Sequence, residues 1–364
     1  MDFSQHVDTF KSIQNALLEY IDNQDNVEIY YQNLIKIIKK IKNHKDEFKS
    51  FICILSMISS NHHRYHDFFD KISKILDFVG QDIKTYLSNS EIFDLFKDNK
   101  RIILYLIDTK MITIDKTVKK QMRKQQKNDE NYQVYFFPDR LYETPKNFEE
   151  KRLIGENESY ICSLIRDDLV EEFISYVNQS NFPLSTTVIK NSLFETNSFL
   201  IGKEVSLIEY CAFYGSIQIF QFLIMSKVKP TPSLWLFVIH SNNADMIHML
   251  ENLHVEPEDK KYEECLNESI KCHHNNIANY IKNNLANEES IEFNLKYVFD
   301  NNFIECCFRY NNISLLDEID YENRFFFYYL CKYNYFELVK LYLSNNKKID
   351  LNETVVFFNS KFFK

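Results

Sequence analysis

Glycine and proline are scarce in this chain, which has 4 glycines, 6 prolines and a single tryptophan in 364 residues. Sandwiches and barrels built from β-strands need many turn residues, so this composition disfavours them. Phosphate-binding and dinucleotide-binding loops need clustered glycines, whereas Gly155 and Gly202 stand alone. No GxSxG sequence is present either, which removes the nucleophile elbow of the α/β-hydrolases.

The chain also lacks long apolar runs and an excess of positive charge. No run approaches the ~18 apolar residues that span a bilayer, and the first residues, MDFSQHVD, have neither a basic nor an apolar signal region. We therefore expect an intracellular, cytoplasmic protein, with the nucleus as the alternative. The net charge of −9 argues against general nucleic-acid binding. The eight cysteines include no CxxC pair, so we expect reduced, buried thiols.

What the chain does contain is a helix-pair pattern, clearest in Ser206 to Leu223. Taking Gly215 as a turn, apolar or small residues lie three or four apart on both sides of it, which is typical of two helices that each bury one face. One such pair cannot bury its apolar face alone. A stack of similar pairs can, and its extended surface suits binding rather than catalysis.

The N-terminal part, residues 1–112, also has the helical period, and repeat-like pairs begin at about residue 90. Residues 113–156 have a different composition, which predicts a basic, irregular connector. Its cations offer an alternative function, recruitment to nucleic acid or to an anionic membrane, although the solvated face of a helix explains them more simply. They are Lys116, Lys119, Lys120, Arg123 and Lys124.

From residue 157 to residue 364 the pair pattern is sustained. The turns predicted from it lie about 33 residues apart on average, the length of an ankyrin repeat. They are Asp168, Gly215, Asn242, His273, Asn311 and Asn334. The predicted fold class is therefore all-α, with a solenoid of helical pairs after an all-helical N-terminal region, and the residues three and four before each turn should pack the first helices together.

Particular residues add a resemblance to this periodicity. Asn334 to Asn352 is similar to the second helix and following loop of an ankyrin repeat, and Ser206 to Glu209 stands where that repeat has T-P-L-H. The chain also resembles a family of ankyrin-like proteins expanded in parasitic protists, which share a helical N-terminal region followed by GENESYICSLIRDDLVEEFISYV, as at residues 155–177. The resemblance implies a non-catalytic scaffold or adaptor that binds a protein partner on a concave surface.

A rigid stack would display the first-helix residues that packing does not need, with little ordering on binding. Tyrosine and arginine often dominate the energetics of interfaces. The predicted partner-binding residues are Tyr210, Phe213, Tyr214, Phe237, His240, Arg309, Tyr310, Tyr329, Lys332 and Tyr333.

Catalytic, metal and cofactor sites are not expected from the sequence. Cys272 beside His273 and His274 has the composition of a thiol nucleophile site. His62 and His66, four residues apart, could share a metal if they lay on one helix. Neither group is completed by nearby residues, so a thiol or metal-dependent hydrolase is only the remote alternative to a binding protein.

Overall fold

The protein is mostly helical in a computed structural model, which describes residues 3–286, 302–316, 324–333 and 335–345. The chain divides into two compact units. Unit 1 comprises residues 1–55 and 288–364, and unit 2 comprises residues 56–287. The boundaries expected at residues 112 and 156 therefore lie inside unit 2.

Unit 1 joins the two ends of the described chain. Helix α1 packs against α2, η4 and α20. Within this core the side-chain amide of Gln14 donates to Asn312 Oδ1 at 2.5 Å, and Gln14 Oε1 accepts from the backbone nitrogen of Ser314 at 3.2 Å. Besides a helix over 302–309, the elements of unit 1 are α1 (Phe3–Asp22), α2 (Val27–Ile41), the first part of α3 (Lys45–Asn61), η4 (Ile313–Leu315), α19 (Arg324–Lys332) and α20 (Phe336–Asn345).

The first part of unit 2 follows from α3 and extends to residue 154. Its elements are α4 (Phe68–Tyr86), α5 (Asn89–Phe96), α6 (Lys100–Asp108), α7 (Lys116–Gln125), α8 (Tyr132–Phe136), η1 (Pro138–Arg140) and α9 (Phe148–Ile154). Lys100, at the start of α6, forms a buried ion pair of 2.7 Å with Asp129. The segment expected to be an irregular connector thus contains the helices α7, α8 and α9, joined by irregular stretches, and lies within unit 2.

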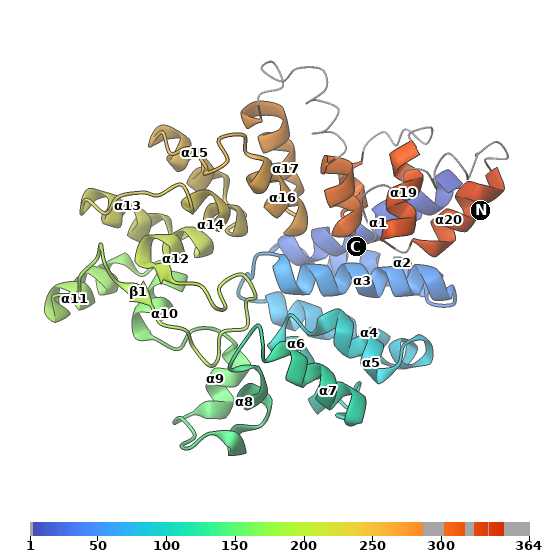
Figure 1. The fold of residues 1–364 in the computed structure, drawn as a ribbon, viewed down its shortest axis with the longest axis horizontal. Coiled ribbons are helices and arrows are strands. Elements are labelled where there is room, and N and C mark those ends of the chain that lie inside the picture. Colours follow the sequence, from blue (N-terminus) through green and yellow to red (C-terminus); the bar gives the residue numbers. More distant parts are fainter. Residues whose placement is uncertain (1–2, 287–301, 317–323, 334, 346–364) are drawn as a thin grey trace. The chain divides into compact units, whose positions relative to one another are not determined.

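Helical pairs make up the rest of unit 2. The first helices α10, α12, α14 and α16 pack against one another in chain order, and α11 packs against α13 (Figure 1). The pairs are α10 (Tyr160–Arg166) with α11 (Val170–Ser180), α12 (Leu207–Tyr214) with α13 (Ile217–Met225), α14 (Leu234–His240) with α15 (Ala244–Asn252), and α16 (Glu263–Lys271) with α17 (Asn275–Tyr280), which continues as the π-helical η2 (Ile281–Leu285). Strands β1 (Val188–Ile189) and β2 (Val205–Ser206) pair antiparallel in the long loop before α12.

The turns predicted within the pairs are confirmed at five positions. Every one of these residues has a positive φ, which allows the tight reversal that ends a first helix. The angles are 48° at Asp168, 72° at Gly215, 50° at Asn242, 60° at His273 and 54° at Asn311. At several of these turns, the residue that follows the turn residue donates its backbone N–H to the carbonyl of the residue five positions before it. Ser216, which follows Gly215, donates in this way to Cys211 at 3.0 Å. Asn334 and residues 346–364 lie outside the described residues.

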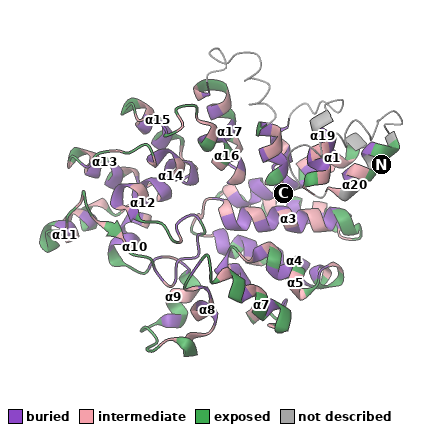
Figure 2. Ribbon diagram, in the orientation of Figure 1, coloured by how far each residue is buried: buried purple, intermediate pink, exposed green. Residues whose placement is uncertain are grey.

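The core lies where the helical period predicted it (Figure 2). Of the residues three and four before the five confirmed turns, all are buried; Leu330, before Asn334, is buried too, and its neighbour Cys331 is half-buried. The predicted reduced cysteines are found as free thiols, all of them buried except Cys53 and Cys331. Among the described helices, none combines the length and apolarity needed to traverse a bilayer.

Candidate functional site

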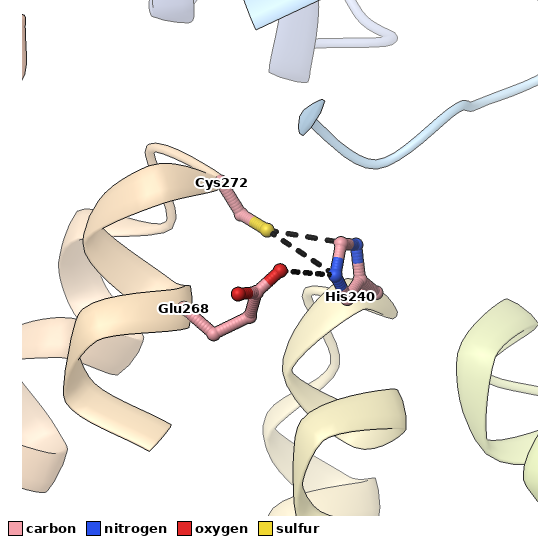
Figure 3. Close-up of side chains that lie close together, drawn as sticks. All are labelled: His240, Glu268 and Cys272. Carbon is pink, nitrogen blue, oxygen red and sulfur yellow. Dashed lines mark hydrogen bonds and ion pairs between the residues drawn. The ribbon is translucent and has the colours of Figure 1, made fainter. Parts of the chain in front are cut away.

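Two consecutive helical pairs bring His240, Glu268 and Cys272 together (Figure 3). His240 is the last residue of α14. Glu268 lies in α16 and Cys272 caps its C-terminus, so their spacing of four places both on one face of that helix. Side chains from neighbouring repeats thus form a single mixed cluster.

The cluster is compact and enclosed. His240 Nε2 lies 2.8 Å from Glu268 Oε1, and Cys272 Sγ lies 3.5 Å from Nδ1 and 3.7 Å from Nε2 of the same ring. His240 is 2% exposed and Cys272 is fully buried. Because the sulfur is almost equidistant from both nitrogens, it lies over the ring and not along an N–H bond. This geometry differs from the in-line hydrogen bond between an active-site thiol and its base.

Burial decides the charge of each group. It raises the pKa of the Cys272 thiol well above its usual range, which keeps the sulfur protonated. It also lowers the pKa of His240, despite the neighbouring carboxylate. Burial alone would raise the pKa of Glu268, but hydrogen bonds and charge from His240 and Lys271 outweigh it and lower that pKa to about 2. At neutral pH the Glu268 carboxylate is therefore ionised, and the Cys272 thiol beside it is protonated and unreactive.

Two aromatic rings complete the enclosure, Phe199 from the loop before α12 and Phe213 from α12 itself. The centroid of Phe199 lies 4.0 Å from that of the His240 ring, and Phe213 lies 5.2 Å from it. The Lys203 ammonium lies 3.2 Å from the Phe199 centroid. Phe199 of this loop therefore covers the ring of His240, the α14 member of the cluster.

The sequence did not predict this cluster, because it paired Cys272 with its neighbours. In the structure His273 Nδ1 lies 3.1 Å from the Lys271 carbonyl, and His274 Nδ1 lies 2.7 Å from that of Ile239. The partner of Cys272 is His240, one repeat earlier. The available signal was that His240 lies two residues and Cys272 one residue before a predicted turn, since nearby positions of successive helical pairs are neighbours in a stack.

His62 and His66 do not share a helix face, because α3 ends at Asn61. His62 is buried, with Nδ1 2.7 Å from the carbonyl oxygen of Cys272. The His66 side chain is 97% exposed and lies 3.8 Å from Asp167. The structure thus separates the two histidines that spacing alone would combine.

A second feature of unit 2 is a cleft of about 570 Å³ where α10 and α12 end. Its walls include Arg64, Arg101, Arg166 and Tyr214. The guanidinium carbons of Arg101 and Arg64 lie 3.7 and 5.0 Å from the ring centroid of Phe69. Two like charges therefore converge on one aromatic ring. Burial and the charge of Arg64 lower the pKa of Arg101 to about 10.

The three arginines differ in their partners. Arg166 forms an ion pair of 2.7 Å with Glu156. Arg64 donates to the hydroxyl and carbonyl oxygens of Thr196, at 2.8 and 3.1 Å, and Arg101 donates to the Ile154 carbonyl at 2.8 Å. Across the described ranges, neither Arg64 nor Arg101 has a carboxylate within ion-pair distance. The positive charge of this pair is therefore not neutralised by direct contact.

The predicted partner-binding residues fall into two groups. The exposure that the prediction assumed is wrong for the buried residues Tyr210, Phe213, Phe237, His240 and Tyr329. For Phe213 and Phe237 the reason is the loop before α12, because Phe199 stacks on Phe213 at 5.8 Å and contacts Phe237 at 5.0 Å. Tyr329 is buried within unit 1, where it stacks on Phe308 at 6.2 Å. Tyr210 instead accepts a hydrogen bond from Arg166 at 3.2 Å.

The remaining predicted residues reach the surface at least in part. Tyr214 is half-buried and lines the cleft. In unit 1, Arg309 and Lys332 are exposed and Tyr310 and Tyr333 are half-buried. Three of these four surround Glu305, whose carboxylate lies 2.8 Å from Lys332 Nζ, 2.8 Å from Tyr333 Oη and 3.2 Å from Arg309 Nη2. For all of these residues, partner binding stays a prediction.

The basic residues of the predicted connector lie on α7. Val118 and Met122 are the buried residues of this helix. Lys116, Lys119, Lys120, Arg123 and Lys124 are all exposed. Their exposure agrees with a solvated helix face and leaves recruitment to nucleic acid or a membrane as a prediction.

Comparisons do not assign the chain to a group of known proteins. No model of a protein family, no curated protein and no solved structure matches it. The resemblance to ankyrin repeats therefore stays a prediction that rests on the residues and turns described above.

Proposed function

We propose that this chain is a non-catalytic interaction protein, in which an ankyrin-type stack of helical pairs holds a protein partner. The observation that carries the proposal is the cleft at the ends of α10 and α12, with Tyr214 in its wall beside three arginines. Tyrosine and arginine are the residues that most often supply binding energy at protein interfaces. The stack fixes both helix ends, so little side-chain freedom is lost when a partner docks.

Glu150, Glu156 and Asp167 also line the cleft, where Glu156 pairs with Arg166 and Asp167 lies 3.8 Å from His66. The charge that a partner would meet is therefore that of Arg64 and Arg101. Arg64 and Arg101 lie over the same ring without a contacting carboxylate. A carboxylate from the partner would offset their mutual repulsion and accept charge-assisted hydrogen bonds. We therefore expect the docking segment of the partner to carry acidic side chains, and we expect high salt to weaken its binding.

The test is affinity capture from the native cell with the full chain, followed by a binding isotherm for each retained protein. Tyr214→Ala should lower the affinity at least tenfold. Tyr142→Ala is the matched control, because Tyr142 is fully exposed and lies outside the cleft. Equal affinities of the two variants, both folded by circular dichroism, would contradict the proposed docking site.

A second candidate function is recruitment to an anionic surface through α7. It is favoured by the five exposed cations on a helix of ten residues. Replacing all five with glutamine should leave the fold intact, since none of them is buried. Loss of salt-dependent binding to anionic vesicles or RNA in this variant would favour recruitment, and a wild-type chain that binds neither would remove it.

A further inference from the structure

The donor atoms of the His240, Glu268 and Cys272 cluster are those that zinc prefers. An imidazole nitrogen, a carboxylate oxygen and a sulfur all lie within 4.8 Å of one another. Structural and catalytic zinc sites use the same three ligand types. Unlike a surface group of acidic residues, this cluster is mostly shielded from water: His240 and Cys272 are buried, and Glu268 is half-buried.

The distances are close to those of a tetrahedral site. Zinc bonds of roughly 2.1 Å to nitrogen and 2.3 Å to sulfur place these two atoms about 3.6 Å apart. Cys272 Sγ lies 3.5 and 3.7 Å from the nitrogens of His240. A nitrogen and an oxygen on the same ion would be about 3.3 Å apart, compared with 2.8 Å between His240 Nε2 and Glu268 Oε1. Metal binding therefore requires the Glu268 carboxylate to move about 0.5 Å away from His240 Nε2.

The ring of His240 must also turn, since its nitrogens do not point at the sulfur. Glu268 and the ring both move about side-chain bonds, so the backbones of α14 and α16 can stay in place. Glu268 and Cys272 already share one helix face, as pairs of metal ligands four residues apart do. Phe199 and Phe213, which pack against the ring of His240, must shift with it when it turns.

We propose that His240, Glu268 and Cys272 bind one zinc-class divalent cation, which links the first helices of two consecutive pairs. On binding, the thiol loses its proton to solvent and the sulfur bonds to the metal as a thiolate. The ring binds in its neutral form, and a water molecule completes the tetrahedron. Because α14 and α16 come from neighbouring pairs, the metal stabilises their packing directly.

Cobalt is the probe for this site, because a cobalt–thiolate bond gives a charge-transfer absorption that oxygen and nitrogen ligands do not. The full chain is purified without a histidine tag, stripped with a chelator and titrated with Co²⁺. We expect the band to saturate at one ion per chain and to disappear when Zn²⁺ is added. Zn²⁺ should also raise the midpoint of thermal unfolding.

Cys272→Ala should abolish both the band and the thermal shift. Cys265→Ala is the matched control, because Cys265 is a buried cysteine of α16, the helix that Cys272 caps, but belongs to no such cluster in the described residues. The proposal is overturned if the wild-type chain gives no band, if Cys272→Ala retains it, or if the folded control loses it equally. Capture of a partner by Tyr214 does not depend on any of these results.

Discussion

The carboxylate of Asp168, in the turn between α10 and α11, accepts a hydrogen bond of 3.0 Å from the backbone nitrogen of Ile219, in the first turn of α13. Its second oxygen accepts from the nitrogen of Gln218, also at 3.0 Å. The turn of one helical pair thus caps the second helix of the next pair. Such a cap satisfies backbone donors that the helix itself cannot, and its charge matches the helix dipole.

Removing this cap should destabilise unit 2 without altering its fold. Asp168→Ala loses both hydrogen bonds and also puts alanine at a φ of 48°. We therefore expect the free energy of unfolding to fall by about 2 kcal/mol. In Asp168→Asn, the asparagine tolerates the left-handed conformation and keeps one hydrogen-bond acceptor. The free energy of unfolding should therefore fall by about half as much. Urea unfolding followed by circular dichroism measures both. Asp167→Ala is the control, since the Asp167 side chain is exposed and accepts no hydrogen bond from a helix N-terminus in the described residues. A loss of stability equal to that of Asp168→Ala would refute the capping role.

Alanine substitutions at two glycines should distinguish the free-energy cost of a strained backbone from that of a steric contact. Gly215 and Gly202 have nearly the same φ, 72° and 75°, but a Cβ at Gly215 would lie 3.3 Å from Ser241 Cβ, whereas none lies within 4 Å at Gly202. Gly202→Ala should therefore cost only the left-handed backbone penalty of about 1 kcal/mol. Gly215→Ala should cost more, because it also pushes α12 away from the neighbouring turn. Equal unfolding free energies for the two variants would show that the stack does not need this close approach.

Glu195 should make the free energy of unfolding depend on pH. It is 5% exposed, its Oε2 has no hydrogen-bond partner, and burial raises its pKa, although the charge of Arg64 opposes the shift. A carboxyl whose folded pKa lies above its unfolded value adds most stability below the unfolded pKa, and this contribution is lost as the pH rises through the folded pKa. Glu195→Gln should therefore stabilise the protein at pH 7 by about 1 kcal/mol.

The stabilisation by Glu195→Gln should decrease as the pH falls. It should vanish below about pH 4, where the Glu195 carboxyl of the wild type is protonated in both the folded and the unfolded state. Thermal unfolding of the variant and the wild type across this range measures the difference. A gain that is the same at every pH would mean that it arises from packing instead of ionisation.

Local periodicity predicted the helices and their turns because both depend on nearby residues. Gly215 and Asn242 tolerate the left-handed backbone of a tight turn, and the residues before them are apolar at helical spacing. The same reasoning correctly placed residues such as Ile165 and Ile239 in the core. These features need no knowledge of distant parts of the chain.

The surface could not be predicted in the same way. Phe213, Phe237 and His240 face away from the positions that pack one first helix on the next, so they were expected to be exposed. Phe199, in a loop whose path periodicity does not encode, covers them. Nor does periodicity predict the path of the chain between Asp168 and Gly215, where this loop lies. The cluster of His240 and Cys272 was missed for a related reason, since it joins two repeats.

The division into units was also beyond local reasoning. Gln14 and Asn312 are bonded to each other in unit 1 although almost the whole chain separates them. Nothing in the helical pattern of residues 3–22 specifies that partner. Sequence alone therefore predicted an array running to the C-terminus, whereas the structure joins the C-terminal helices to the N-terminal ones within one unit.

The most direct test of the proposed interaction function is photo-cross-linking from the cleft itself. A photoreactive phenylalanine replaces Tyr214 in one sample and the exposed Tyr142 in the other, and both full chains are irradiated in the native cell. The account predicts a discrete cross-linked protein from position 214, with an acidic segment at the attachment point, and none from position 142. Irradiation that attaches no protein at position 214, or the same proteins at both positions, would contradict it.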